Sequence, residues 1–118
     1  MKIRMLSKSA FTLVEIMIVV AIIGLLAAIA IPNFVRARTT SQQNACINNL
    51  RQIDGAVQTW ALENRKSPTD TYTLDIVKPY IRLDSTGNIP ACPASGSYSP
   101  GATVSNAPTC NIANHTMQ

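Results

Sequence analysis

Charged residues are missing from the C-terminal stretch of the sequence. Residues 85–118 contain no Asp, Glu, Lys or Arg, and the last acidic residue of the chain is Asp84. Calcium sites are built from several oxygen ligands, with carboxylates among them. We therefore expect no calcium site in this stretch.

Groups that could perform catalysis are equally scarce. The chain of 118 residues has a single histidine, and it contains no Gly-rich phosphate loop, no candidate triad and no paired carboxylates near a predicted pocket. These absences argue against catalysis. We expect the protein not to be an enzyme and to bind no cofactor.

A concentrated basic surface is lacking as well. The formal net charge is +4, but Lys2, Arg4 and Lys8 lie together within the first ten residues, and beyond residue 40 the basic residues are balanced by acidic ones. Proteins that bind DNA neutralise its phosphates with many Lys and Arg side chains. Nucleic acid is therefore not an expected partner.

The dominant feature of the sequence is an apolar run near the N-terminus. Residues 11–31 contain one charged residue, Glu15. At about 1.5 Å per residue, a helix of this length spans about 30 Å, the thickness of the hydrocarbon core of a bilayer. A carboxylate inside such a helix costs about 2.5–3.5 kcal/mol and usually has a function and a partner. We predict a membrane helix in which Glu15 pairs with a cation.

Three interpretations of the N-terminal region compete. Residues 1–10 form a basic head directly before the apolar run, which is typical of a targeting segment. A secretory signal peptide could be cut at Ala28-Ile29-Ala30, but its apolar region would be too long and would contain Glu15. A plain membrane anchor explains the length and the basic head but gives no reason for Glu15.

The third interpretation comes from a resemblance. The segment Ser9-Ala10-Phe11-Thr12-Leu13-Val14-Glu15, followed by the apolar run, resembles the processing site of type IV pilins and type II secretion pseudopilins, and the resemblance is specific up to about Arg38. It implies that a prepilin peptidase cuts between Ala10 and Phe11 and methylates the new amine of Phe11. The residue before the cut is nearly always glycine in that family, whereas this sequence has Ala10.

The resemblance also implies an assembly role for Glu15, Gly24 and Pro32. The new ammonium of one subunit would lie against Glu15 of a neighbour, and breaking such a buried pair costs about 3–5 kcal/mol. Pro32 cannot donate a helical hydrogen bond, and the helix would loosen between Gly24 and Pro32 when it packs in a filament. The expected partners are other pilin-like subunits, prepilin peptidase, an inner-membrane assembly platform and membrane lipid.

An amphipathic pattern follows the apolar run over residues 33–66. Spacings of 4, 3, 4 and 3 place five residues on one helical stripe: Cys46, Leu50, Ile53, Val57 and Trp60. Nothing demands a break before this segment, so it can continue the membrane helix, and Pro68 is expected to end it. The stripe must be covered by another part of the chain.

The cover is expected from residues 67–118. Residues 75–80 predict a helical turn or two interrupted at Pro79, and the later Pro- and Gly-rich segment predicts short strands or a hairpin. The predicted organisation is a leader (1–10), a membrane and assembly helix (11–32), its amphipathic continuation (33–66) and a small C-terminal cap (67–118). The predicted fold class is α+β, pilin-like, with a loop-rich antiparallel β cap.

The three cysteines suggest a disulfide in this cap. Cys92 and Cys110 flank a turn-rich segment, and a bridge closing such a loop would stabilise an exported domain by about 3 kcal/mol. Cys46 would be a buried apolar residue, although a bridge from Cys46 to either of the others stays open. A zinc site of these cysteines with His115 has an allowed ligand set, but the spacing lacks a C-x-x-C pair and the expected compartment is oxidising. We expect the disulfide and no metal.

These observations favour a structural subunit of a pilus-like filament, either a type II secretion pseudopilin or a related type IV pilin. The protein would be a single-pass protein of the bacterial inner membrane, with its C-terminal part in the periplasm or in an extracellular filament. Two alternatives are a competence-type DNA-uptake pilin and a monomeric membrane-anchored binding protein.

Overall fold

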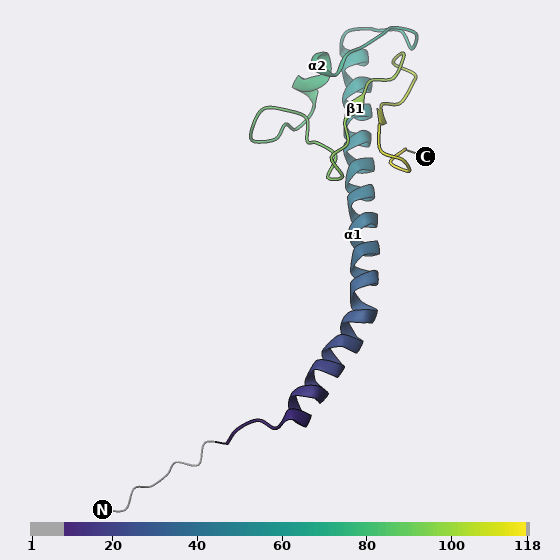
Figure 1. Ribbon diagram of the computed structural model, residues 1–118. Helices are drawn as coiled ribbons and strands as arrows, with labels where there is room; N and C mark the ends of the chain where they lie inside the picture. Colours follow the sequence, from purple (N-terminus) through teal and green to yellow (C-terminus); the bar gives the residue numbers. More distant parts are fainter. Residues whose placement is uncertain (1–8, 118) are drawn as a thin grey trace, which may run out of the picture. The chain divides into compact units, whose positions relative to one another are not determined.

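The structure, a computed structural model, describes residues 9–117. A long helix, α1 (Leu13–Glu63), is followed by a short helix, α2 (Leu74–Val77), a 3-10 turn, η1 (Lys78–Tyr80), and two strands, β1 (Tyr98–Ser99) and β2 (Thr109–Cys110) (Figure 1). The predicted α+β class is confirmed. Of the predicted leader, residues 1–8 with their three basic side chains lie outside the described residues. The chain divides into two units, which meet at residues 37 and 38.

Helix α1 begins at Leu13 because Thr12 and Glu15 cap its first turn. The Thr12 side-chain Oγ1 accepts a hydrogen bond from the Glu15 backbone N–H at 3.2 Å, and the Glu15 carboxylate accepts one from the Thr12 backbone N–H at 2.9 Å. This reciprocal pair is a capping box, which satisfies two donors that a helix start otherwise leaves unpaired. The predicted membrane helix therefore starts two residues later than the apolar run.

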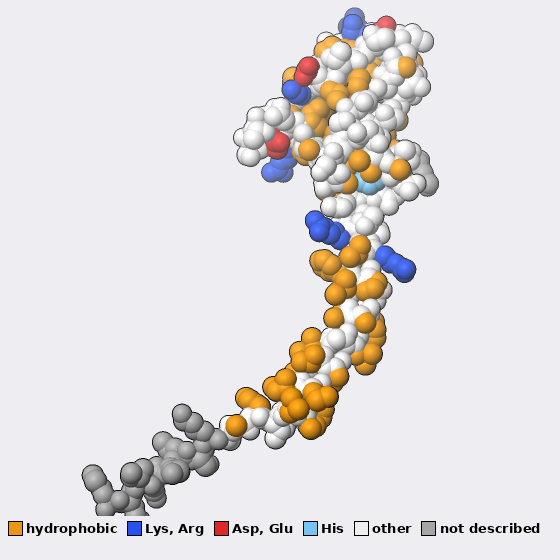
Figure 2. Space-filling model, in the orientation of Figure 1, with side chains coloured by type: hydrophobic (Ala, Val, Ile, Leu, Met, Phe, Trp, Pro, Cys, Tyr) orange, Lys and Arg blue, Asp and Glu red, His pale blue; other side chains and the backbone are white. Residues whose placement is uncertain are grey.

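The first unit exposes almost all of its apolar side chains. Phe11 is 83% exposed and Leu25 66% exposed, and many apolar side chains lie on the face of this part of α1 that Figure 2 shows. Within the described residues, α1 contains a segment long and apolar enough to cross a membrane. The helix is uninterrupted through Gly24 and Pro32, so the predicted loosening between them stays a prediction about the packed filament.

The second unit buries the predicted stripe of α1. All five residues of the stripe are buried, and Ala56 and Ala61 join them on the same side of the helix. Tyr72, Val77 and Val104, which come from the chain beyond α1, complete the buried core. The prediction that residues 67–118 cover the stripe is therefore confirmed by this packing.

The covering segments contain little regular structure. Helix α2 and turn η1 form the predicted helical turns, with Pro79 in the first part of η1. Strands β1 and β2 pair antiparallel, with Tyr98 opposite Cys110 and Ser99 opposite Thr109. A sheet of two such short strands is not stable alone, so it depends on its contacts with the rest of the unit.

Hydrogen bonds between loops hold the cap together. The backbone N–H of Val104 donates to the carbonyl of Asp70 at 2.9 Å, and the Tyr72 hydroxyl accepts a hydrogen bond from the Gly101 N–H at 2.7 Å. Gln58 of α1 donates to the Val104 carbonyl at 3.0 Å. A Cβ atom at Gly101 would collide with the Asn106 backbone, so only glycine permits this close approach.

Helix α1 ends through a left-handed residue rather than through Pro68. Arg65 has φ +53°, its N–H donates to the carbonyl of Leu62 at 3.4 Å, and the Lys66 N–H donates to the carbonyl of Ala61 at 2.8 Å. This is the Schellman arrangement, in which glycine usually occupies the left-handed position. Arginine there carries the steric cost of its Cβ atom.

Replacing Arg65 with glycine should stabilise the second unit. We expect Arg65→Gly to raise the free energy of unfolding by about 0.5–1 kcal/mol, because glycine adopts a positive φ without the Cβ clash. The measurement is thermal unfolding of the full chain in detergent, followed by circular dichroism. Arg65→Ala is the control, since it removes the same side chain but keeps the clash. Equal midpoints for the two variants would contradict this interpretation of the helix end.

Candidate functional site

The predicted cleavage site lies just outside helix α1. Ala10 and Phe11 are exposed and precede the helix start at Leu13. A peptidase needs an accessible peptide bond that is not held in a helix, and the Ala10–Phe11 bond meets this requirement. Cleavage and methylation at Phe11 stay predictions.

The Glu15 carboxylate has a partner in its own chain. It accepts the hydrogen bond from the Thr12 N–H described above, and among residues 9–117 no cation forms an ion pair with it. The predicted pairing with a cation therefore requires a group that only processing or a neighbouring subunit supplies. The sequence analysis missed the capping role, although the pattern T-x-x-E before an apolar run signals it.

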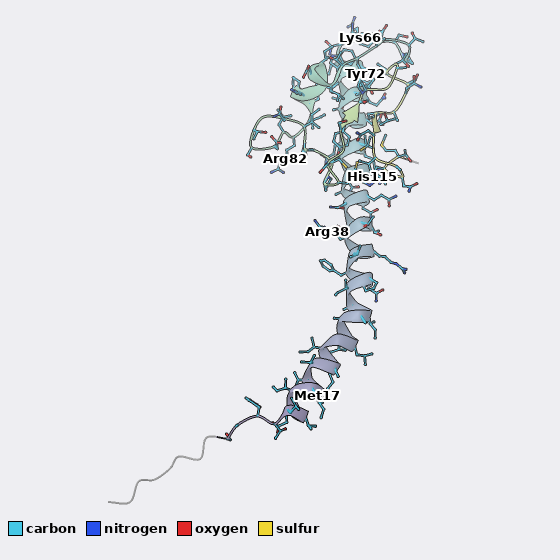
Figure 3. All side chains as sticks on the ribbon, viewed as in Figure 1. Met17, Arg38, Lys66, Tyr72, Arg82 and His115 are labelled. Carbon is cyan, nitrogen blue, oxygen red and sulfur yellow. The ribbon has the colours of Figure 1, made fainter. Side chains whose placement is uncertain are left out.

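A second candidate site is a cluster of sulfur and nitrogen ligands in the second unit. Cys46 lies in α1, Cys92 in a loop, Cys110 in β2, and His115 in the segment that follows. Figure 3 labels His115 beside helix α1. The potential ligand atoms of the four residues all lie within 4.8 Å of one another. We call these four residues the thiol–imidazole cluster. Cys46, Cys92 and His115 are buried, while Cys110 is partly exposed.

The local backbone brings the four side chains together. Antiparallel pairing places Cys110 opposite Tyr98, and the chain before β1 passes so close to Cys110 that a Cβ atom at Gly96 would lie 2.8 Å from its sulfur. Gly96 therefore leaves room for the Cys110 side chain. The Cys92 sulfur lies 3.4 Å from Nδ1 of His115.

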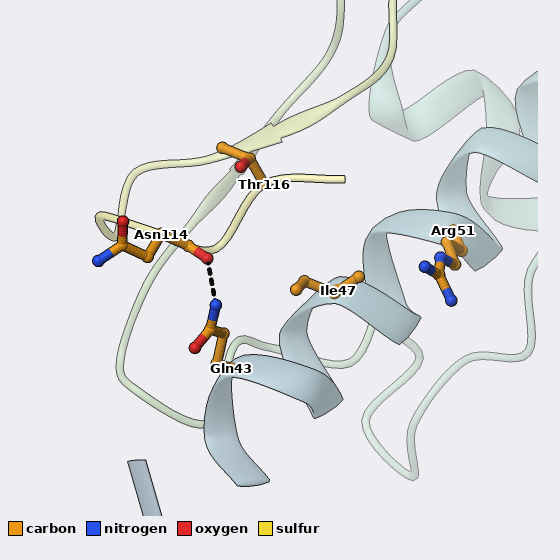
Figure 4. A pocket seen from close by; sticks show the side chains of 5 residues that line it. All are labelled: Gln43, Ile47, Arg51, Asn114 and Thr116. Carbon is orange, nitrogen blue, oxygen red and sulfur yellow. Dashed lines mark hydrogen bonds between the residues drawn. The ribbon is translucent and has the colours of Figure 1, made fainter. Parts of the chain in front are cut away.

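An open pocket of about 420 Å³ lies beside the loop that carries His115. Gln43, Ile47 and Arg51 of α1 form one side, and Asn114 and Thr116 form the other (Figure 4). Gln43 Nε2 donates to the Asn114 carbonyl at 2.7 Å, which ties the residue next to His115 to the helix. The five lining residues include no carboxylate and no nucleophile with a neighbouring base.

Hydrogen bonds to the sulfurs make the thiols of the cluster unequal. Burial raises the pKa of Cys46. Burial also raises the pKa of Cys92, but hydrogen bonds from the backbone of Ala94, from Cys46 and from the backbone of Gly96 together lower it below its usual value. Cys92 is thus the thiol of this pair that ionises more readily.

The predicted Cys92–Cys110 disulfide is not confirmed. All three cysteines are free thiols, and the chain brings Cys46 and His115 to the same place as the predicted pair. This set of four was considered as a zinc site and set aside, because the spacing lacks a C-x-x-C pair and the expected compartment is oxidising. The four residues come from a helix, a loop, a strand and the segment after it, so their spacing in the sequence does not indicate that they converge.

Comparison with known proteins identifies the N-terminal segment. Residues 5–31 match the family described as the prokaryotic N-terminal methylation motif. The chain is 58% identical over 43 residues to the type IV major pilin protein PilA of Myxococcus xanthus, a match that covers 36% of this chain and 20% of that protein.

Two further relatives extend the similarity. The chain is 31% identical over 68 residues to type II secretion system core protein G of Aeromonas hydrophila, covering 58% of this chain and 48% of that protein. It is 43% identical over 60 residues to the type IV major fimbrial protein FimA of Dichelobacter nodosus, covering 51% and 38%. No solved structure matches the chain significantly.

The matched part thus spans at most about half the length of these three relatives. The predicted resemblance is confirmed: this chain carries the prokaryotic N-terminal methylation motif and is similar in sequence to type IV pilins and to type II secretion core protein G.

Proposed function

We propose that the protein is a structural subunit of a pilus-like filament, of the type II secretion or type IV pilus kind, and that it is not an enzyme. The observation that carries this proposal is the apolar surface of α1 in the first unit, which no other part of the described chain covers. The relatives named pilin, fimbrial protein and secretion core protein support it.

The exposed apolar side chains of α1 must be removed from water both before and after assembly, first by lipid and then by other subunits. Burying one large aliphatic side chain gains about 1.5–3 kcal/mol relative to water, so this part of α1 is stable first in lipid. A subunit leaving the membrane can bury the same side chains only against other copies or similar subunits. We infer that the protein is inserted in the bacterial inner membrane as a single-pass subunit, with its second unit in the periplasm, before it enters a filament.

Processing would supply the cation that Glu15 lacks. Cleavage by a prepilin peptidase between Ala10 and Phe11 creates an ammonium one residue before Thr12, whose N–H already contacts the Glu15 carboxylate. In the filament, the Phe11 ammonium of one subunit would pair with Glu15 of its neighbour. An assembly platform in the inner membrane would deliver subunits in this register. Glu15 then has two roles, as a helix cap within its own chain and as a charge between chains.

Neither alternative function gains support. The relatives named above are pilins, a fimbrial protein and a secretion core protein, and this likeness favours a filament over a monomeric anchored binding protein. Of the basic residues of the second unit, Lys78 pairs with an acidic residue, Asp75, at 2.9 Å.

Two substitutions separate the two roles of Glu15. Glu15→Gln keeps the capping box, since glutamine serves as well as glutamate at that position, but removes the charge. We expect it to reduce filament yield at least about 100-fold, because the Phe11 ammonium is left unpaired at a cost of about 3–5 kcal/mol. The measurement is the amount of filament sheared from cells, with electron microscopy, against equal subunit levels in membranes.

Thr12→Val is the matched variant, because it removes the cap and keeps the charge. We expect it to destabilise the first helical turn by about 1 kcal/mol and to leave filaments close to wild-type levels. Normal filaments from Glu15→Gln would contradict the proposed charge pairing. Loss of filaments from Thr12→Val as well would show that assembly requires the cap in addition to the charge.

A further inference from the structure

We propose that Cys46, Cys92, Cys110 and His115 bind one zinc ion, which fastens the C-terminal segment to helix α1. The proposal concerns the second unit alone and is independent of filament assembly.

The geometry suits a tetrahedral zinc ion. Zinc lies about 2.3 Å from thiolate sulfur and about 2.0–2.1 Å from imidazole nitrogen, so its ligand atoms are about 3.4–3.8 Å apart in a tetrahedron. The Cys92 sulfur and His115 Nδ1 are 3.4 Å apart, and all four ligand atoms lie within 4.8 Å. Zinc binding thus requires the most distant ligand atoms to move closer together by only about 1 Å.

The donor set selects zinc over the harder cations. Three sulfurs and one imidazole nitrogen make up the cluster, and three cysteines with one histidine are a standard set for structural zinc. Calcium and magnesium prefer oxygen ligands, and the sequence has no acidic residue after Asp84. Soft thiolate ligands in a tetrahedral arrangement favour zinc among the common divalent ions.

A hydrogen bond beside the cluster fixes part of its surroundings. Tyr98 lies opposite Cys110 across the two strands, and Asn49 Nδ2 of α1 donates to the Tyr98 hydroxyl at 3.0 Å. Polar contacts around a metal site help to orient its ligands.

Zinc accounts for all four residues, whereas a disulfide accounts for two. Any bridge between two of the cysteines would leave the third thiol and His115 together in the core. His115 is the one buried polar or charged residue among residues 9–117, and its Nδ1 atom lies 3.4 Å from the Cys92 sulfur. One ion gives the imidazole and each thiolate a ligand bond.

The ion would also supply stability that the small cap lacks. Strands β1 and β2 have two residues each, and such a sheet cannot hold its position alone. A single ion bonded to α1, to the loop before β1, to β2 and to the tail ties four segments together. Binding free energy of this kind becomes folding free energy.

The primary test measures metal and thiols in the same sample. The full chain is purified in detergent without added reductant or chelator, its metal content is measured by mass spectrometry, and its thiols are alkylated after denaturation with a chelator. We expect about one zinc per chain and alkylation of all three cysteines. Zinc-free protein would overturn the proposal, whether two cysteines prove to be joined by a disulfide or all three prove to be free.

Substitutions test whether the four named residues hold the ion. Cys110→Ser and His115→Ala should each weaken zinc binding at least about tenfold and lower the unfolding midpoint. Thr109→Ser and Thr116→Ala are matched controls, because they change exposed neighbours of the same two ligands and should leave zinc content unchanged. Full zinc occupancy in Cys110→Ser and His115→Ala would overturn the assignment.

A conservative variant keeps the test decisive if the others fail to fold. His115→Cys supplies a fourth thiolate, and a set of four cysteines is an equally good structural zinc site. We expect it to retain zinc and, after exchange with cobalt, to show the visible absorption of a tetrahedral cobalt–thiolate centre. Loss of zinc from His115→Cys, at wild-type expression, would contradict a ligand role for position 115.

Discussion

The structure depends on an apolar surface that the chain itself does not cover. In the first unit, Leu13, Leu25 and their neighbours are exposed around the whole helix, and their free energy in water would be prohibitive. We therefore infer that lipid covers this surface before assembly and that other subunits cover it afterwards. The capping box between Thr12 and Glu15 gives this helix a defined start without using the charge of the carboxylate. That charge stays available for the ammonium that processing at Phe11 would create.

In the second unit, segments with little helix or strand cover one stripe of α1. Loops rather than a sheet provide the cover, and specific contacts replace extensive packing. The Tyr72 hydroxyl bonds to the Gly101 backbone, Gln58 bonds to the Val104 carbonyl, and Gln43 holds the loop next to His115. The thiol–imidazole cluster lies where these covering segments meet the helix. A bound ion there would link segments that otherwise share only a small core.

Features that depend on the helical repeat could be predicted from the sequence. Features that depend on residues far apart in the sequence coming together could not. The spacing of Cys46, Leu50, Ile53, Val57 and Trp60 predicted the buried stripe, because a helix repeats every 3.6 residues. The sequence pattern placed the helix end close to the observed end at Glu63. It did not predict the left-handed cap, because an arginine at a positive φ, as at Arg65, carries no signal in the sequence. The capping role of Glu15 was missed although its pattern was visible. The set of residues 46, 92, 110 and 115 was considered and set aside in favour of a Cys92–Cys110 disulfide, which stays a prediction, since no spacing rule indicates that these four residues meet.

The proposed function requires that the chain is processed at Phe11 into a subunit that polymerises. The intact mass of the protein recovered from membranes, with its N-terminal peptide sequenced by fragmentation, tests this. We expect a mature chain that begins at N-methylated Phe11, despite alanine rather than glycine at position 10. A chain that retains residues 1–10 would contradict it and leave a simple anchor. A chain that begins at Ile31 would also contradict it, because cleavage after Ala30 would release the second unit as a secreted domain.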